Sequence, residues 1–212
     1  MPDEQSYKKS TIIVLRHGEP DGSNYADKKI FRGITDDVLT KKGWQQMANA
    51  IATIENTIDV ILTSPLKRCA EFALSVATQH NITMHHIDAF QEIDFGQWEG
   101  RSVQDVECEA SDNLKRFWQN PLHYTPPDGE PVADFQQRVV ARWQESIKSY
   151  QDKTVLLIAH GGVQKIILAE VLNMPVQAIH NIEVPYACCS IFHIYYNDGE
   201  IISTLKSHGR LA

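Results

Sequence analysis

The stretch TIIVLRHGEP, from Thr11 to Pro20, runs five aliphatic or β-branched residues directly into Arg16 and His17. Continuous apolar runs of this kind are typical of parallel strands that are covered on both faces. Arginine and histidine are seldom placed in such an interior, so their position at the end of the run calls for an explanation. Open parallel sheets bind ligands outside the carboxyl ends of their strands. The stretch therefore predicts a buried strand that carries a cation and an imidazole to a ligand site.

Two further apolar runs lead to polar residues of the same kind. VILTS, at 60–64, is followed by Arg68 in the first turn of an expected helix, and TVLLIA, at 154–159, is followed by His160. The helix macrodipole disfavours a cation in a first turn, and a bound anion would reverse that effect. HGG, at 160–162, opens another expected helix and presents backbone N–H groups to an anion. We expect the strand ends to converge on one oxyanion, and guanidinium groups suit a phosphoryl group in particular.

The remaining pattern alternates strands with helices. Thr40 is expected to cap an amphipathic helix, and Ser64 and Pro65 are expected to be the cap and the first residue of another. Further elements are expected as a strand at 82–87, helices at 103–119 and near 132–150, and a closing hairpin of 188–196 with 200–206. The predicted fold class is α/β, with three layers (α/β/α), a mostly parallel central sheet and helices on both faces. We expect residues 1–212 to form one domain, in which the less regular segment near 91–135 covers the substrate.

The composition excludes several classes of protein. The formal net charge of −7 argues against a general binder of nucleic acid or of anionic membranes, although a local basic pocket can still hold a small anion. No apolar run approaches the ~18 residues that span a bilayer, and residues 1–10 lack an apolar signal core, so we expect a cytoplasmic protein. The four cysteines show no C-x-x-C spacing and are expected to be reduced thiols. His85 and His86 would face opposite sides of a strand and no metal-binding motif is present, so neither a metal nor another cofactor is expected.

Four segments resemble the histidine phosphatase superfamily, whose fold is phosphoglycerate mutase-like. They are LRHGE at 15–19, TSPLKRCAEFA at 63–73, EIDFGQWEG at 92–100 and IAHGG at 158–162, and they occur in that family's order. The resemblance extends from about residue 11 to residue 195. Within the family, EIDFGQWEG, PPDGE at 126–130 and the last strand and helix look most similar to the α-ribazole-5′-phosphate phosphatases of cobalamin biosynthesis.

The resemblance implies a metal-independent phosphatase whose substrate is a small-molecule phosphate monoester, either α-ribazole 5′-phosphate or adenosylcobalamin 5′-phosphate. It implies that His17 attacks phosphorus and becomes a phosphohistidine, while Arg16, Arg68 and His160 surround the phosphoryl oxygens. Glu92 would be the general acid that protonates the leaving alkoxide and later activates water. These roles suit the residues, since imidazole is largely unprotonated above pH ~6.5 and one carboxyl can serve first as acid and then as base.

The identity of the acid is open from the residues alone. Glu92 has four rivals in the sequence, which are Glu19, Asp94, Glu99 and Glu130. Aromatic residues flank the acid motif and either stack on a flat base of the substrate or pack in the core. They are Phe95, Trp98, Trp118 and Tyr124.

Contacts to the substrate outside the strand ends are expected from Gly161, Arg32 and Asn24. For Arg32 and Asn24, a plain surface role is the alternative to a phosphate or sugar contact. The family usually has a threonine after RHGE, where this chain has Pro20, so the course of the loop from 20 to 34 is open.

Three other functions are compatible with these motifs. A broad-specificity or sugar-phosphate phosphatase would share the catalytic residues and differ in the segment near 91–135. A phosphoglycerate mutase must exclude water, and its relatives usually carry a basic or tyrosine-containing motif where this chain has DFGQWEG at 94–100. A non-catalytic binder of phospho-ligands would typically lack one of the two histidines or the acid.

Overall fold

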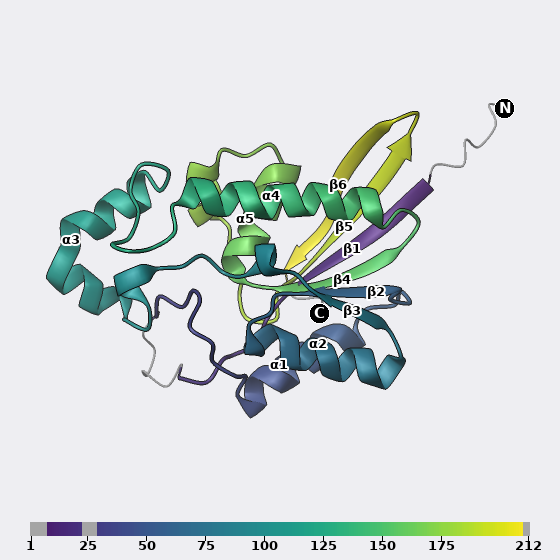
Figure 1. Ribbon diagram of the computed structural model, residues 1–212, viewed down its shortest axis with the longest axis horizontal. Helices are drawn as coiled ribbons and strands as arrows, with labels where there is room; N and C mark the ends of the chain where they lie inside the picture. The colour runs from purple at the N-terminus through teal and green to yellow at the C-terminus, as the bar shows by residue number, and fades with distance from the viewer. Residues whose placement is uncertain (1–7, 23–28, 210–212) are drawn as a thin grey trace.

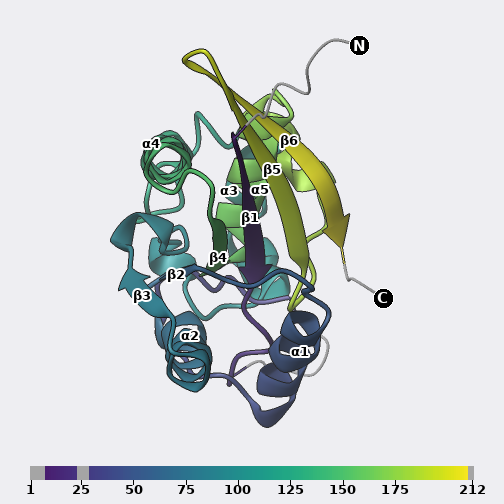
Figure 2. The same cartoon turned by 90° about the vertical axis from the view of Figure 1, so that its right-hand side faces the viewer.

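The computed structural model describes residues 8–22 and 29–209 (Figure 1). Within these residues, six strands form one mixed sheet in the order β3-β2-β4-β1-β5-β6. The strands are β1 (Lys8–Arg16), β2 (Val60–Thr63), β3 (Thr83–His86), β4 (Thr154–Ala159), β5 (Cys189–Asn197) and β6 (Glu200–Gly209). The first four run parallel, and β5 and β6 add an antiparallel hairpin beside β1 (Figure 2). The predicted strands and closing hairpin are confirmed.

The helices of the described residues lie between these strands along the chain. They are α1 (Lys41–Ala52), α2 (Lys67–His80), α3 (Val103–Gln119), α4 (Val132–Ser149) and α5 (Gly161–Val171), with short 3₁₀ turns η1 (Asp88–Phe90), η2 (Gly96–Trp98) and η3 (Val176–Asn181). Thr40 caps α1 as predicted, because its Oγ1 accepts a hydrogen bond from Gly43 N at 2.9 Å. Helix α3 is bent at Ala110, where the backbone leaves the helical range.

The side chains of β1 alternate between two hydrophobic cores. Ile12 and Val14 belong to the core that includes residues of α4 and α5, whereas Ile13 and Leu15 belong to the core that includes residues of α1 and α2. Figure 1 shows α4 and α5 on one face of the sheet and α1 and α2 on the other. A strand covered on both faces has no side that needs polar residues, which explains the continuous apolar run. The predicted three-layer α/β arrangement is confirmed.

The register of the parallel strands brings three of their ends to the same level. Arg16 at the end of β1 lies opposite Ala159 at the end of β4. Thr63 at the end of β2 lies opposite Ile158 of β4. The residues that follow the three strands therefore start from neighbouring positions on one edge of the sheet.

The predicted start of the second helix is wrong. Helix α2 begins at Lys67, not at Pro65, and Ser64 is not its N-cap. The hydroxyl of Ser64 is hydrogen-bonded to His160 Nε2 at 2.7 Å, so it is engaged by another strand end. The first N–H of the helix, from Lys67, is satisfied by Asp36 Oδ1 at 2.7 Å, which replaces a local cap.

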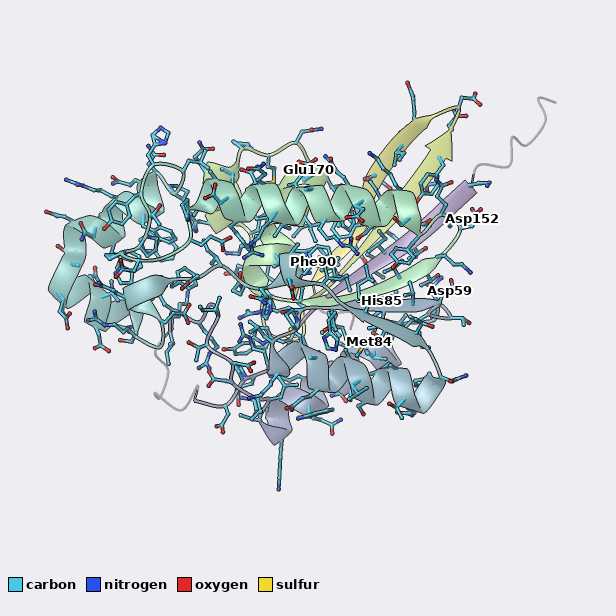
Figure 3. All side chains as sticks on the ribbon, in the orientation of Figure 1. Asp59, Met84, His85, Phe90, Asp152 and Glu170 are labelled. Atoms are coloured by element: carbon cyan, nitrogen blue, oxygen red, sulfur yellow. The ribbon has the colours of Figure 1, made fainter. Side chains whose placement is uncertain are left out.

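The edge strand β3 carries the two adjacent histidines. His85, labelled in Figure 3, and His86 are both exposed. Among the residues that the structure describes, no three His, Cys, Asp or Glu side chains are grouped to hold a metal ion. Nor does any helix within 8–22 and 29–209 have the length and apolarity to cross a membrane. All four cysteines are free thiols, three of them buried (Cys69, Cys188 and Cys189) and one exposed (Cys108).

Candidate active site

Two imidazoles face one another at the carboxyl edge of the sheet. His17, directly after β1, and His160, directly after β4, have ring centroids 5.2 Å apart at an interplanar angle of 62°. Their exposed fractions are 3% and 0%. The charges of Arg16 and Arg68 contribute to lowering the pKa of both imidazoles. The structure therefore brings these four side chains, from three separate strand ends, to one place.

His17 is held as a neutral imidazole with a defined free nitrogen. Its Nδ1 lies 2.7 Å from the backbone oxygen of Gly18. Because a carbonyl oxygen only accepts, Nδ1 carries the proton and the lone pair is on Nε2. Burial, followed by the charges of Arg16 and Arg68, lowers the pKa of His17 well below 6.5. An unprotonated Nε2 of this kind is suited to nucleophilic attack.

His160 is the N-cap residue of α5 and is fixed by two neighbours. Its Nε2 lies 2.7 Å from the Oγ of Ser64, and its ring nitrogens lie 3.7 and 3.9 Å from the Sγ of Cys69. Burial lowers the pKa of His160 well below 6.5, and the next contributions come from Arg68 and His17. The ring is therefore neutral near pH 7 and can act through hydrogen bonding, not through a full charge.

The guanidinium groups of Arg16 and Arg68 supply the positive charge of the site. Arg68 is fully buried and donates from Nη1 to Thr35 O and from Nη2 to Gly33 O, both at 2.6 Å. Arg16 donates from Nη1 to the backbone oxygen of Val184. The Nε groups of both arginines are buried and have no protein hydrogen-bond partner. Buried N–H groups are nearly always hydrogen-bonded, so this pair of donors indicates a site for an anion.

Tyr186 belongs to the site and was not expected from the sequence. The Cζ of Arg16 lies 4.4 Å from the centroid of the Tyr186 ring, and that ring lies 5.8 Å from the ring of His17. The ring quadrupole attracts the guanidinium and helps to hold Arg16 beside His17. Tyr186 follows a proline in the loop before β5, where no periodic pattern could have indicated its position.

Glu92 is buried against the first turn of α5. Its Oε2 accepts from Gly162 N at 2.9 Å and its Oε1 from Ile93 N at 3.0 Å, so the N–H of Gly162, which we expected to face a bound anion, binds this carboxyl instead. A Cβ on Gly162 would lie 2.2 Å from Oε1, which explains the glycine. Burial raises the pKa of Glu92, while the two N–H donors and the charges of Arg68 and Arg16 oppose the shift. A buried carboxyl with a raised pKa is suited to proton transfer near neutrality.

Three of the rival carboxylates have other partners. Glu19 is paired with Lys42 at 2.7 Å, and Glu130 is paired with Arg138 at 2.6 Å. Asp94 accepts within its own turn, from the N–H two residues later, at 2.7 Å. Glu92, in contrast, is hydrogen-bonded to the helix start that follows His160.

Glu99, the fourth rival, organises a loop. Its carboxylate oxygens accept from the N–H groups of residues 33, 34 and 35 at 3.1 to 3.2 Å. The carbonyl groups of the same loop receive the two hydrogen bonds from Arg68. Glu99 therefore holds the loop to which Arg68 is hydrogen-bonded.

The further predicted substrate contacts have different outcomes. A Cβ on Gly161 would lie 3.3 Å from the nearest guanidinium nitrogen of the site, so Gly161 is adjacent to it. Arg32 forms an ion pair with Asp37, and its charge still contributes to lowering the pKa of His17. Arg32 is thus paired within the protein, with Asp37 and with the backbone oxygen of Asp21 at 2.9 Å. Asn24 falls outside the described residues.

The aromatic residues near the acid motif divide into core and surface. Trp98 is buried at 2% exposure, and Phe95 and Tyr124 are partly buried against the same core. Trp118, at the end of α3, is 41% exposed, and its ring lies 4.7 Å from that of His180 in η3. Burial, followed by the charge of Lys165 on α5, lowers the pKa of His180. Of these four aromatic residues, Trp118 alone is exposed.

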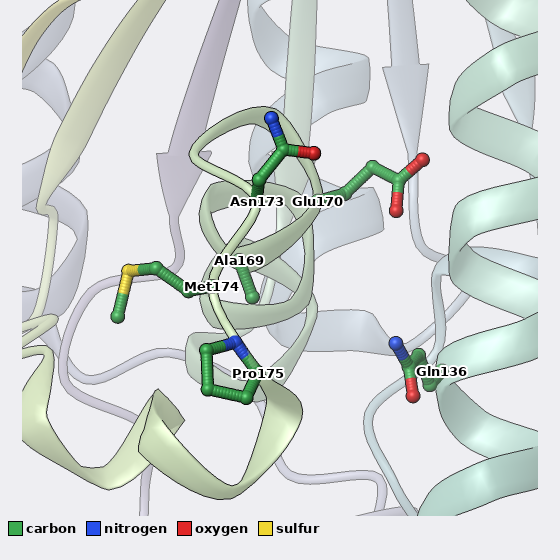
Figure 4. A pocket seen from close by; sticks show the side chains of 6 residues that line it. All are labelled: Gln136, Ala169, Glu170, Asn173, Met174 and Pro175. Atoms are coloured by element: carbon green, nitrogen blue, oxygen red, sulfur yellow. The ribbon is translucent and has the colours of Figure 1, made fainter.

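A separate depression lies at the opposite end of α5. It has a volume of about 420 Å³ and is lined by Gln136, Ala169, Glu170, Asn173, Met174 and Pro175 (Figure 4). Its lining begins roughly 12 Å along the helix from Gly161, since an α-helix rises ~1.5 Å per residue. The lining side chains include no cation and no nucleophile, so the chemistry belongs to the histidine edge.

The sequence model of one protein family matches almost the whole chain. The family is described as "Histidine phosphatase superfamily (branch 1)", and its sequence model aligns with residues 12–206. The chain belongs to the histidine phosphatase superfamily. Members of this superfamily are phosphatases or mutases. The resemblance seen in the sequence motifs is confirmed.

The chain is similar to several individual proteins of known name. The adenosylcobalamin/alpha-ribazole phosphatase of Escherichia coli K12 is 28% identical over 187 residues, which cover 86% of this chain and 89% of that protein. The crystal structure of the alpha-ribazole phosphatase from Shigella flexneri matches with a TM-score of 0.78 at 27% identity, covering 94% of this chain and 96% of that one. A bifunctional protein of Mycobacterium tuberculosis is 26% identical over 202 residues, and this chain spans only 54% of its length.

Proposed function

We propose that this protein is a phosphatase that hydrolyses phosphate monoesters through a phosphohistidine on His17. One observation supports it most directly: the unprotonated Nε2 of His17 lies in the same buried site as the unpartnered Nε donors of Arg16 and Arg68. A phosphoryl group bound there would receive charge-assisted hydrogen bonds from the arginines while phosphorus faces the nucleophile. Membership of the superfamily supports the same class of reaction.

In the first step, Nε2 of His17 bonds to phosphorus as the bond from phosphorus to the alcohol oxygen breaks. The electron pair leaves on that oxygen, and the carboxyl of Glu92 gives it a proton. Burial raises the pKa of Glu92, which favours the protonated form that this step requires. His160 and the two arginines stabilise the charge that develops on the phosphoryl oxygens.

In the second step, the carboxylate of Glu92 takes a proton from water, and the water oxygen attacks phosphorus. The bond from phosphorus to nitrogen breaks, and its electron pair returns to Nε2 of His17. The products are the free alcohol and inorganic phosphate. Neither step uses a metal ion. The same side chains stabilise the transition states of both steps.

For the substrate, we propose α-ribazole 5′-phosphate or adenosylcobalamin 5′-phosphate. The name of the Escherichia coli relative supports this choice. The exposed indole of Trp118, which lies against His180, offers a surface on which a flat base can stack. The alternative is a broad-specificity or sugar-phosphate phosphatase, because the same catalytic residues would serve it.

The test is a phosphate-release panel with α-ribazole phosphate, phosphoglycerates, nucleotides and fructose bisphosphates, run with and without a chelator. We expect α-ribazole phosphate to be the best substrate, the chelator to have no effect, and His17→Ala to abolish release. Interconversion of phosphoglycerates without release would indicate a mutase. Loss of activity with the chelator, restored by a metal ion, would contradict the metal-independent mechanism.

A further inference from the structure

All five N–H donors of one arginine on α4 are used around the segment that carries the candidate acid. Arg138 donates from Nη1 to the backbone oxygens of Ala89 and Gln91, both at 2.9 Å, and from Nη2 to the backbone oxygen of Glu92 at 3.2 Å. Its Nε and Nη2 also donate to the two carboxylate oxygens of Glu130, at 2.6 and 2.8 Å. A guanidinium has five N–H groups, so none is left without a partner.

The carboxylate that pairs with Arg138 fixes the other side of the same segment. The backbone N–H of Glu130 donates to Asp94 O at 2.8 Å, and its Oε2 accepts from Asp94 N at 3.4 Å. The side chains of Arg138 and Glu130 are only 27% and 19% exposed, which favours a strong bidentate pair. The backbone before and after Glu92 is therefore hydrogen-bonded to one ion pair, that of Arg138 with Glu130.

Arg138 also bears on the surroundings of the Glu92 carboxyl. Its Cζ lies 4.8 Å from the ring centroid of Phe135, one turn earlier on α4. The Phe135 ring reaches the start of α5, because a Cβ on Gly162 would lie 3.2 Å from its Cζ. Gly162 is the residue whose N–H holds Oε2 of Glu92. The Phe135 ring thus lies between the Arg138 guanidinium and the first turn of α5, where Gly162 N binds the Glu92 carboxyl.

We propose that Arg138 is a positioning residue that fixes Glu92 where it can transfer a proton. This inference rests on the proposed function, in which Glu92 is the acid. Without Arg138, the backbone oxygens of residues 89, 91 and 92 lose their hydrogen-bond donors and the segment is free to shift. A shift near 1 Å at a reacting group lowers the rate about 10²-fold.

The nature of the leaving group separates this role from a general loss of structure. An alkyl phosphate needs a proton on the departing alkoxide, whereas p-nitrophenolate leaves without one. We expect Arg138→Ala to lower kcat/KM about 10²-fold for an alkyl phosphate and less than about threefold for p-nitrophenyl phosphate. Arg138→Lys, with three donors in a different geometry, should fall between Arg138→Ala and the wild type. Arg142→Ala is the matched control, since Arg142 lies one turn later and pairs with Glu145 on its own helix at 2.7 Å.

Amide hydrogen exchange gives a readout that does not depend on turnover. The N–H groups of Ile93 and Gly162 both bind the Glu92 carboxyl, so Arg138→Ala and Arg138→Lys should speed their exchange, and Arg142→Ala should not. Equal losses on both substrates, or unchanged exchange at these two amides, would overturn the proposal. A wild-type protein that releases phosphate from neither substrate would overturn the proposed function instead, and exchange would still decide whether Arg138 holds the segment.

Discussion

Replacing Gly162 with alanine places a methyl group against the carboxyl of Glu92. The added Cβ would lie 2.2 Å from Oε1 of Glu92 and 3.2 Å from Cζ of Phe135. Since Cβ contacts below 3.0 Å are essentially never observed, the oxygen must move by at least 0.8 Å. The carboxyl turns as a unit, so the 2.9 Å hydrogen bond from Gly162 N to Oε2 is weakened as well. A displacement of this size should lower proton transfer about 10²-fold, and the overpacking should cost ~1–3 kcal/mol in the free energy of unfolding.

The assay compares kcat/KM for an alkyl phosphate with that for p-nitrophenyl phosphate. Gly162→Ala should lose about 10²-fold on the first and only a few-fold on the second, because only the first needs the acid. Gly161→Ala is the graded comparison, since its Cβ would lie 3.3 Å from Arg16 Nε and the guanidinium need shift only by a few tenths of an ångström. In the proposed mechanism Arg16 binds the phosphoryl group of either substrate, so kcat/KM should fall equally for both. A folded Gly162→Ala protein with wild-type activity on the alkyl phosphate would refute the placement of Glu92 as the acid.

Three further outcomes are expected. Trp118→Ala should raise KM for α-ribazole phosphate about fivefold or more and leave KM for glycerol phosphate unchanged, because stacking of a base on an aromatic ring contributes ~1–3 kcal/mol; equal changes in both would contradict a stacking role. The free energy of unfolding should fall as the pH drops below 6.5, since the unfolded chain then binds protons on His17 and His160 that the folded chain, with its lowered pKa values, does not. Urea unfolding should show a loss of up to about 1.4 kcal/mol per pH unit for each histidine, and an equally steep loss in His17→Asn would disprove the linkage. Burial raises the pKa of Cys69 to about 12, so iodoacetamide should label the exposed Cys108 and spare Cys69. Peptide mapping that finds both cysteines labelled at one rate would contradict the protection of Cys69.

Three strand ends of the site could be predicted from the sequence because each is a local pattern. Continuous apolar runs mark strands covered on both faces, and parallel pairing then brings Arg16, His17 and His160 to one edge whatever the loops do. Arg68 followed from its short distance to the end of β2. The same local reasoning failed at Ser64, because a cap pattern does not include His160, 96 residues away, which binds the hydroxyl.

The rest of the site depends on contacts between segments that no local pattern relates. Glu92 meets Gly162 across 70 residues, and Arg138 meets Glu92 across 46. Both contacts arise because the segment after η1 packs between α4 and the start of α5. The sequence carried one signal for the first contact, the second of the two glycines after His160. A single glycine lets the backbone approach an anion, whereas the second one is needed because a carboxyl occupies the space of its side chain.

His17 is proposed to take the phosphoryl group while Arg16 and Arg68 hold it. The most direct measurement is rapid chemical quench with a radiolabelled phosphate monoester, followed by peptide mass spectrometry at alkaline pH, because phosphohistidine survives alkali and is lost in acid. We predict one label per active site, on Nε2 of His17, formed at least as fast as phosphate is released and absent from His17→Ala. A label on any other residue, or undiminished phosphate release by His17→Ala, would contradict the proposal.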